Sequence, residues 1–349
     1  IDASWEIDVF GAQKDNTAAA EASLEASHAA LHSVWVTLSS EVALNYLSLR
    51  TLQERMRIAH LNLELREETL SMVASLYDAG LRDSLALHQA RYAVETTKAS
   101  IPSIKSNIEN VMNALAIMTG RVPGSLEQSL ARPGPIPKAR YVSLTGIPAD
   151  TIRQRPDIRA AERALVAQMS RKASAEKDLL PRFFLSGSLG LETLSGGSLF
   201  SGDSVGFAFG PRITLPIFHG GAIRKNIRVQ AEREEQLLAA YEGTVLDAVA
   251  EVRNALASST QEDERNKILN SGLESARAAF EIASDKYKSG LTTFNDVISA
   301  QDALLSFEDQ IAISEGQMTS NVVRIYKALG GGWAPMTEEG METPPRDEK

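Results

Sequence analysis

Cysteine is absent from this chain of 349 residues, so disulfide bonds, zinc–thiolate sites and cysteine nucleophiles are excluded. Basic residues are in the minority, because 36 Lys and Arg stand against 45 Asp and Glu, giving a formal net charge of −9. A nucleic-acid-binding protein normally presents a basic face, so we expect no nucleic-acid partner. No run of about 18 apolar residues occurs, which excludes an encoded transmembrane helix.

Motifs for catalysis and metal binding are lacking too. We find no Ser-His-Asp set, phosphate-binding loop or GxGxxG pattern, and most carboxylates fall on the solvated faces of long helices. His28 and His32 have the i, i+4 spacing of metal ligands on a helix, but beyond Glu25 no third ligand converges on them. We therefore expect no enzymatic activity, no cofactor and no metal site.

What the chain does contain is an internal repeat. A shift of 210 positions superposes residues 11–120 on residues 221–330 without insertion or deletion. A repeat that keeps its length is typical of a rigid, mostly helical unit, because loops tolerate changes of length. The matched pairs include Gly11 and Gly221, Tyr77 and Tyr287, Gly80 and Gly290, Leu81 and Leu291, and Gly120 and Gly330. We predict a tandem duplication of one long helical hairpin.

Each half of the repeat predicts a long helix, a turn and a returning helix. Neither Gly nor Pro occurs from residue 12 to 79, and a helix of that span would measure roughly 100 Å. Gly80 and Gly290 mark the turns, and returning helices are expected over residues 85–118 and 296–329, with Pro102 a candidate kink in the first. Apolar residues recur along the first helix every 3.5 residues, which predicts coiled-coil packing. The seam positions are 38, 42, 45, 49, 52, 56, 59, 63, 66, 70, 73 and 77, and the same positions plus 210.

Three segments alternate between apolar and polar or small residues, as β-strands do: residues 1–10, 183–191 and 205–217. The later two form a hairpin that suits a lipid-facing barrel or a soluble sandwich, and the pattern by itself favours neither. Two β segments inside a helical chain cannot build a sandwich, whereas copies from several chains could close a barrel, so we predict a barrel hairpin. Its lipid-facing residues are predicted to be Phe183, Leu185, Leu189, Val205, Phe207 and Phe209.

The chain divides along its length into seven expected segments. These are the end of a strand at 1–10, a first helical-hairpin repeat at 11–120, a Pro/Gly-rich connector at 121–155, an ascending helix at 156–181, a β-hairpin at 182–218 with an external loop at 192–204, a second helical-hairpin repeat at 219–330, and a disordered tail at 331–349. The chain starts without Met or a signal peptide, and we interpret it as a fragment whose N-terminus is cut.

Several short motifs give the chain a family resemblance. They are Ser4-Trp5-Glu6-Ile7-Asp8-Val9-Phe10-Gly11, Gln154-Arg155-Pro156-Asp157-Ile158-Arg159-Ala160-Ala161-Glu162-Arg163, Leu180-Pro181-Arg182-Phe183, Leu215-Pro216-Ile217-Phe218-His219-Gly220-Gly221 and Ala328-Leu329-Gly330-Gly331-Gly332-Trp333. In this order and spacing they resemble the outer-membrane factor family, the TolC/OprM-like efflux channels, and within it the NodT-type lipoprotein subgroup. The resemblance covers residues 1–333.

The resemblance implies a fold and a function. The expected fold is mainly α with a small β part: tandem coiled-coil hairpins form a periplasmic α-barrel, and strands contribute to a trimeric transmembrane β-barrel. The expected function is the exit duct of a tripartite efflux system in the outer membrane of a Gram-negative bacterium. The partners implied are two further copies of the chain, outer-membrane lipid, a periplasmic adaptor (membrane fusion protein), and an inner-membrane pump of the resistance-nodulation-division type.

The same resemblance assigns roles to residues at the hairpin ends. The turn residues Gly80, Leu81, Gly290 and Leu291 match the family's adaptor-docking turns, although glycine with positive φ also suits an ordinary helix turn. Tyr77, Tyr287 and Asp296 match the family's periplasmic gate, with core packing for the tyrosines and helix capping for Asp296 as alternatives. Thr292 and Ser299 replace charged residues of a relative, so Arg82, Asp83, Arg91 and Asp302 are candidates for a different ionic set.

Two other functions stay open at this point. The chain could be an exit duct for type I protein secretion, with the same architecture. It could also be a non-conducting periplasmic coiled-coil scaffold or adaptor, although an adaptor would need more β structure than this chain encodes, and a scaffold leaves the alternating strands unexplained.

Overall fold

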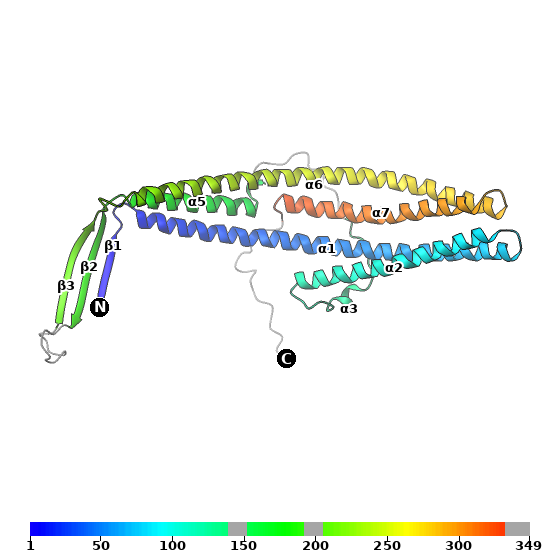
Figure 1. Cartoon of the computed structure of the whole chain (residues 1–349), viewed down its shortest axis with the longest axis horizontal. Helices are drawn as coiled ribbons and strands as arrows, with labels where there is room; N and C mark the ends of the chain where they lie inside the picture. The colour runs from blue at the N-terminus through cyan, green and yellow to red at the C-terminus, as the bar shows by residue number, and fades with distance from the viewer. Residues whose placement is uncertain (139–151, 192–204, 332–349) are drawn as a thin grey trace. The chain divides into compact units, whose positions relative to one another are not determined.

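A computed structural model describes residues 1–138, 152–191 and 205–331 (Figure 1). The expected external loop at 192–204 lies outside these residues, as do the centre of the connector and nearly all of the tail. The chain forms two compact units, the first made of Ile1–Ser33 and Pro148–Ala248 and the second of Val34–Ile147 and Val249–Lys349. The elements are β1 (Asp2–Ile7), α1 (Ala12–Asp78), α2 (Ser84–Met118), α3 (Glu127–Leu130), α5 (Pro156–Lys177), β2 (Arg182–Leu191), β3 (Val205–Thr214), α6 (Ala222–Lys288) and α7 (Phe294–Ala328).

The duplication is visible in the helix lengths. Helices α1 and α6 each span 67 residues, and α2 and α7 each span 35. Uninterrupted helix-forming sequence explains the length of α1, and α2 continues through Pro102 to Met118. The mainly helical fold class with a small sheet is confirmed.

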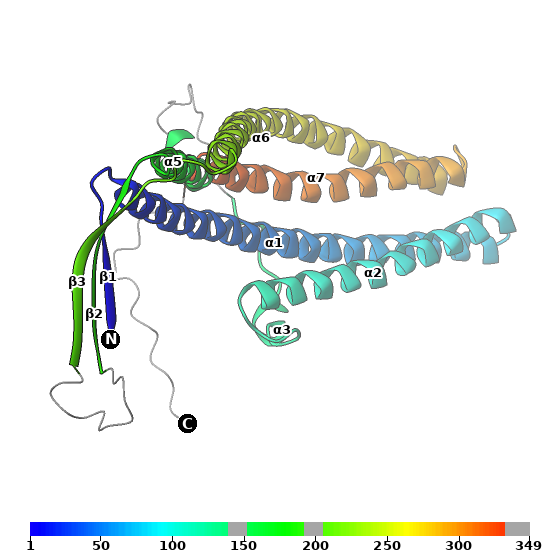
Figure 2. The ribbon, with the colours of Figure 1, turned by 60° about the vertical axis from the view of Figure 1, so that its left-hand side comes forward.

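The first unit contains an antiparallel sheet in the order β1-β2-β3 (Figure 2). The sheet pairs Trp5 with Leu185 and Leu185 with Pro211, so odd-numbered residues of all three strands share one face. The strand expected over 205–217 ends at Thr214, so its last three residues were predicted wrongly. Pro216 has no N–H for a ladder bond, which explains the end, whereas Pro211 is tolerated because β3 is an edge strand.

Ion pairs join the helices of the first unit. Helix α5 lies between the first part of α1 and the first part of α6 (Figure 1). Lys177 Nζ lies 2.6 Å from Asp15 Oδ2 of α1, and Lys172 Nζ lies 2.9 Å from Glu234 Oε2 of α6. These pairs are partly exposed, so solvent screens them and each contributes little to the stability of the unit.

In the second unit, α7 lies between α1 and α6, and α2 packs on α1 (Figures 1 and 2). Leu49 of α1 packs against Met112 and Leu115 of α2. The guanidinium of Arg55 in α1 makes two bonds of 2.7 and 3.0 Å to the carboxylate of Asp309 in α7. Arg55 and Asp309 therefore form a bidentate bridge between the two hairpins.

The predicted heptad seam is confirmed in α6, where none of the twelve seam positions is exposed. In α1 the seam accounts for only part of the burial. A second stripe, which includes Ile58, Asn62 and Thr69, is also buried, and Thr69 Oγ1 accepts a bond of 3.3 Å from Gln301 of α7. Helix α1 needs two stripes because it packs on its own returning helix and on that of the other hairpin.

None of the helices in the described ranges combines the length and the apolar character required to cross a bilayer.

Candidate functional site

The two hairpin turns have the same hydrogen-bond geometry. Gly80 and Gly290 have φ of 70° and 76°, a conformation that favours glycine. In the first turn, Gly80 N donates to Tyr77 O at 2.9 Å and Leu81 N donates to Leu76 O at 2.9 Å, and the second turn repeats both bonds. This is a Schellman helix end. It leaves Leu81 63% and Leu291 76% exposed, so each turn presents an apolar side chain to solvent.

A shared core joins the two turns just behind these leucines. Tyr287 is only 1% exposed and its ring centroid lies 5.4 Å from that of Phe294. The buried members of this core, which we call the tip cluster, are Val73, Ala86, Leu87, Ala90, Tyr287, Phe294, Val297 and Ile298. Because these residues come from both hairpins, the tips of the two hairpins are packed together within one chain.

Arg82 is the polar contact between the tips. Its Nη2 donates to the Tyr287 carbonyl oxygen at 2.7 Å, and its Cζ lies 4.8 Å from the centroid of the Tyr287 ring. A guanidinium above an aromatic face is attracted to the ring electrons. Burial raises the pKa of Tyr287 above its ordinary value, and the Arg82 charge opposes that shift.

The four charged residues that the sequence offered as an ionic set do not come together. Asp302 pairs with Arg66 at 2.6 Å, and Asp83 caps α2 by accepting from Ala86 N at 3.2 Å. Arg82 contacts Tyr287, and Arg91 is exposed. Within the single chain they therefore form no common ionic set, because Asp302 and Arg82 bond to other helices and Asp83 bonds within its own helix start. Arg66, the actual partner of Asp302, was named only as a seam position.

The two tyrosines of the predicted gate occupy different environments. Tyr287 is buried in the tip cluster, whereas Tyr77, its counterpart in the first repeat, is 40% exposed. Sequence matching treats the two positions as equivalent, and the difference arises because only Tyr287 meets another hairpin of the same chain.

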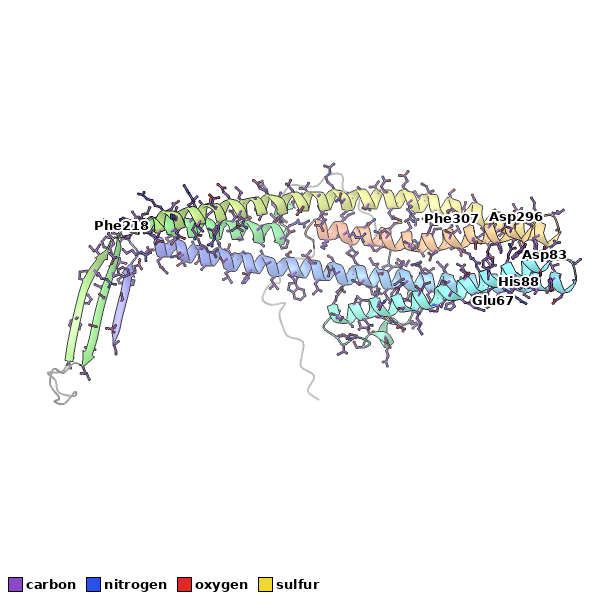
Figure 3. The ribbon with its side chains drawn as sticks, viewed as in Figure 1. Glu67, Asp83, His88, Phe218, Asp296 and Phe307 are labelled. Carbon is purple, nitrogen blue, oxygen red and sulfur yellow. The ribbon has the colours of Figure 1, made fainter. Side chains whose placement is uncertain are left out.

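Asp296 closes the first turn of α7. Its Oδ2 accepts from the hydroxyls of Thr292 at 2.6 Å and Thr293 at 2.7 Å, and from Thr293 N at 3.1 Å. Thr293 and Asp296 form a capping box at this helix start. Figure 3 labels Asp296 at the start of α7 and Asp83 at the start of α2. These hydrogen bonds support the interpretation of Asp296 as a helix-capping residue, and Thr292 contributes one of them.

Acid is expected to loosen the start of α7. The hydroxyls of Thr292 and Thr293 hold the pKa of Asp296 below its ordinary value, so its stabilising effect is present above about pH 4 and is lost as the pH falls through the lowered pKa. Amide hydrogen-exchange protection of residues 294–298 should drop on acidification. In Asp296→Asn, protection should be lower at neutral pH and change less with acid; an identical acid response in both proteins would contradict this assignment.

Both turns line a single hollow of about 430 Å³. Its lining residues are Leu81, Arg82, Asp83, Leu85, Ala86, Gln89, Tyr287, Thr292, Thr293, Phe294 and Asn295. The hollow is thus bordered by an exposed leucine and by the Arg82–Tyr287 contact, and it offers a concave surface at the tips.

The apolar face of the sheet is bare in the first unit. Phe207 and Phe209 of β3 are 75% and 63% exposed, and Trp5 of β1 is 65% exposed. All six residues that the sequence predicted to face lipid lie on this odd-numbered face. Apart from Phe184, the opposite face carries small or polar residues, and Arg212 Cζ lies 5.0 Å from the centroid of the Phe184 ring. A soluble sheet would not leave such a face uncovered.

Within the described part of the chain, no group of three or more side chains is arranged to hold a metal ion. Glu25, the third residue beside His28 and His32, forms an ion pair with Arg163 at 3.2 Å.

Tandem coiled-coil hairpins and a sheet with a bare apolar face define a membrane channel with a helical tunnel. A family model described as "Outer membrane efflux protein" matches residues 1–121 and 147–331. The chain belongs to this family.

Similar proteins agree with this assignment. The chain is 30% identical over 341 residues to Nodulation protein T of Rhizobium leguminosarum bv. trifolii, covering 97% of the chain and 72% of that protein. It is 32% identical to Outer membrane protein OprJ of Pseudomonas aeruginosa, covering 94% of the chain and 68% of that protein. A solved structure of the outer-membrane channel OprN matches with a TM-score of 0.91 at 34% identity, covering 95% of the chain and 74% of that structure's chain.

The family gives the chain its function and location. The protein is the outer-membrane exit duct of a tripartite efflux system, with a helical tunnel in the periplasm. It is a transport protein and not an enzyme. This outcome decides against the scaffold and adaptor alternatives that the sequence left open.

Proposed function

We propose that three copies of this chain assemble into one duct. The observation that carries this proposal is the three-stranded sheet with a bare apolar face and two open edges, β1 and β3. Pairing of edges between copies would satisfy the free backbone groups, and closure would turn the odd-numbered residues towards lipid. The small and polar residues of the other face would then line the lumen.

We further propose that the hairpin tips form the periplasmic gate and the docking site of an adaptor. In this proposal Tyr287 belongs to the gate as part of the tip cluster, Tyr77 as an exposed aromatic, and Asp296 as the residue that orders the start of α7. The docking site consists of Gly80, Leu81, Gly290 and Leu291, supported by the two exposed leucines and the hollow between the turns.

The transported molecules are proposed to be small and to be delivered by an inner-membrane pump of the resistance-nodulation-division type. Relatives from Pseudomonas putida carry names that refer to toluene efflux, solvent efflux and pyoverdine export, all of them small molecules. These names favour small molecules over the protein cargo of type I secretion. The duct conducts passively, and the pump supplies the energy.

Planar-bilayer recording tests the duct. Purified protein should show small and rare conductance steps, because the tips are held together by the tip cluster and Arg82. A well-folded trimer that never conducts, even after the tips are destabilised by Phe294→Ala, would exclude the proposal.

If the turn leucines dock the adaptor, changing them should stop export without preventing assembly of the protein in the outer membrane. Changing both turn leucines, in Leu81→Glu/Leu291→Glu, should leave folding intact because both side chains are exposed. It should abolish export, since an apolar contact would be replaced by buried charge at the adaptor interface. Susceptibility of cells to an exported toxic compound measures export, and the level of protein in the outer membrane measures assembly.

Ile117→Glu provides the matched control. Ile117 is 66% exposed on α2, away from the turns, and should tolerate the charge with export preserved. Unchanged export in the double leucine variant would rule out docking at these residues.

A further inference from the structure

The segment that joins β3 to α6 exposes large apolar side chains. Ile217 is 87% exposed and Phe218 is 94% exposed, and Figure 3 labels Phe218 where the sheet meets α6. The bare apolar face leads into this segment, because Ile213 and Leu215 are 66% and 49% exposed. Apolar exposure therefore continues past the end of the strand to the first turn of α6.

The first turns of α6 carry three cations without partners. Arg224, Lys225 and Arg228 are exposed, and in the described part of the chain none of their side chains forms an ion pair or a hydrogen bond. Their spacing of i, i+1 and i+4 places them on one side of the helix. Cations at a helix start are unfavourable, because the free N–H groups there carry partial positive charge, and α6 has no acidic residue in its first turn. This end of α6 therefore lacks a compensating negative charge.

The start of α1 is the counterpart of the start of α6 in the repeat and has the same backbone. Gly11 and Gly221 have φ of 78° and 81°. Asp15 N donates to Gly11 O at 3.0 Å, and Lys225 N donates to Gly221 O at 3.0 Å. A group held by the start of α1 is therefore a guide to what the start of α6 can hold.

A carboxylate fills this position in α1. Asp8 Oδ2 accepts from Lys14 N at 2.8 Å. The residue that corresponds to Asp8 is Phe218, which cannot accept a hydrogen bond through its side chain. Arg224 N, the counterpart of Lys14 N, has no hydrogen-bond partner among the residues that the structure describes. Helix α6 thus keeps the anion-binding backbone of α1 but has to take its anion from outside the chain.

We propose that Ile217, Phe218, Arg224, Lys225 and Arg228, which we call the junction patch, bind an anionic phospholipid of the periplasmic leaflet. The lipid phosphate lies among the three cations and the free N–H groups of α6, and the two apolar side chains enter the acyl region beside it. The proposal rests on the barrel proposed above, in which the odd-numbered face of the sheet meets lipid.

The length of β3 places the junction patch at the depth of the lipid headgroups. Its 10 residues span about 33 Å, and the tilt of barrel strands reduces this to roughly the 25 Å of an apolar band. Because the helical tunnel lies in the periplasm, the α6 end of β3 lies at the periplasmic surface of the membrane. A free phosphate ion would suit the cations equally well, but it would leave the exposure of Ile217 and Phe218 unexplained.

Native mass spectrometry of the detergent-solubilised protein tests the junction patch. The wild-type protein should retain phosphatidylglycerol, up to one lipid per copy, in preference to zwitterionic phosphatidylcholine. Arg224→Gln/Lys225→Gln/Arg228→Gln should bind phosphatidylglycerol about a hundredfold more weakly, because each cation near a membrane surface contributes about fivefold. Equal binding by this variant and the wild-type protein would overturn the proposal. Displacement of the lipid by an equal concentration of inorganic phosphate would also overturn it, in favour of a site for free anions.

A matched control removes three exposed cations from the second unit. The variant Lys105→Gln/Arg121→Gln/Arg253→Gln changes the net charge by the same amount and should bind phosphatidylglycerol as the wild-type protein does. If the control loses as much lipid as the junction-patch variant, the lipid is held by the overall charge and the junction patch is not its site.

The comparison with α1 has its own test in Phe218→Asp, which gives α6 the carboxylate that α1 has. Because Phe218 is exposed, the fold should persist. The variant should lose phosphatidylglycerol, and the amide of Arg224 should gain hydrogen-exchange protection, whereas Phe218→Leu should keep the lipid. Equal lipid binding by the two variants would contradict the proposal. A conducting trimer that retains no phosphatidylglycerol refutes the lipid site alone, whereas a protein that stays monomeric and never conducts refutes the proposed duct.

Discussion

Replacing Phe207 with Arg is expected to prevent assembly of the protein in the outer membrane. Phe207 is 75% exposed on the bare apolar face, where it lies on the edge strand β3 opposite Leu189. If this face meets lipid, an arginine there costs up to about 4 kcal/mol in each copy, depending on its depth in the bilayer. Three copies would each bear this cost, so the mature trimer should be nearly absent from outer-membrane fractions on immunoblots.

The neighbouring residue supplies the control. Ala208 lies on the opposite face of the same strand, beside the polar and small residues, and pairs with Ser188. Ala208→Arg should assemble at close to wild-type levels and instead change the conductance, because its charge would lie in the lumen. Equal assembly of both variants would mean that the apolar face is covered by protein, and the assignment of Phe207, Phe209 and their neighbours to lipid would be abandoned.

Replacing Gly316 with Val is expected to cause the largest loss of stability in the helical part of the protein. Gly316 is buried where α7 crosses α1, and an added Cβ would lie 2.0 Å from Thr51 Oγ1 and 3.1 Å from Thr51 Cβ. The Thr51 hydroxyl is held by a bond of 2.9 Å to Leu47 O, so it cannot easily turn away. Forcing the helices apart should destabilise the fold by about 3 kcal/mol, the upper end for overpacking.

Thermal unfolding of the detergent-solubilised protein, followed by circular dichroism, measures this loss. Gly243→Val in α6 is a matched control, because an added Cβ at Gly243 meets nothing within 4 Å, and it should leave stability almost unchanged. Adding Thr51→Ala to the Gly316→Val protein should recover part of the loss. If the stability changes of Gly316→Val and Thr51→Ala simply add in the double variant, then the close approach of α7 to α1 at this point does not cause the loss of stability.

At the hairpin tips, residues that match in sequence have different side-chain environments in the structure. Sequence matching gave Tyr77 and Tyr287 the same role, yet only Tyr287 is buried under Arg82. Asp296 was matched to a gate residue, and in the structure its carboxylate bonds with the threonines of its own helix start. In each case the repeat predicted the backbone correctly, while the side-chain environment depended on which hairpin lay next to it.

The sequence by itself determined the local structure. Absence of Gly and Pro over 67 residues produced α1, and glycines with positive φ ended the long helices. Strict alternation placed the residues that were predicted to face lipid on one face of the sheet. These features follow from backbone freedom and side-chain periodicity, which act over a few neighbouring residues.

Only the tertiary structure decided which faces meet. The bond from Arg82 to Tyr287 joins residues 205 positions apart, and the approach of Gly316 to Thr51 joins two different hairpins. A heptad pattern predicts that one stripe of a helix is buried, but it does not predict which helix covers that stripe. The sequence therefore did not predict the second buried stripe of α1. The choice depends on the packing of all four long helices at once, because each contact is favourable only when the surrounding helices hold both partners in place.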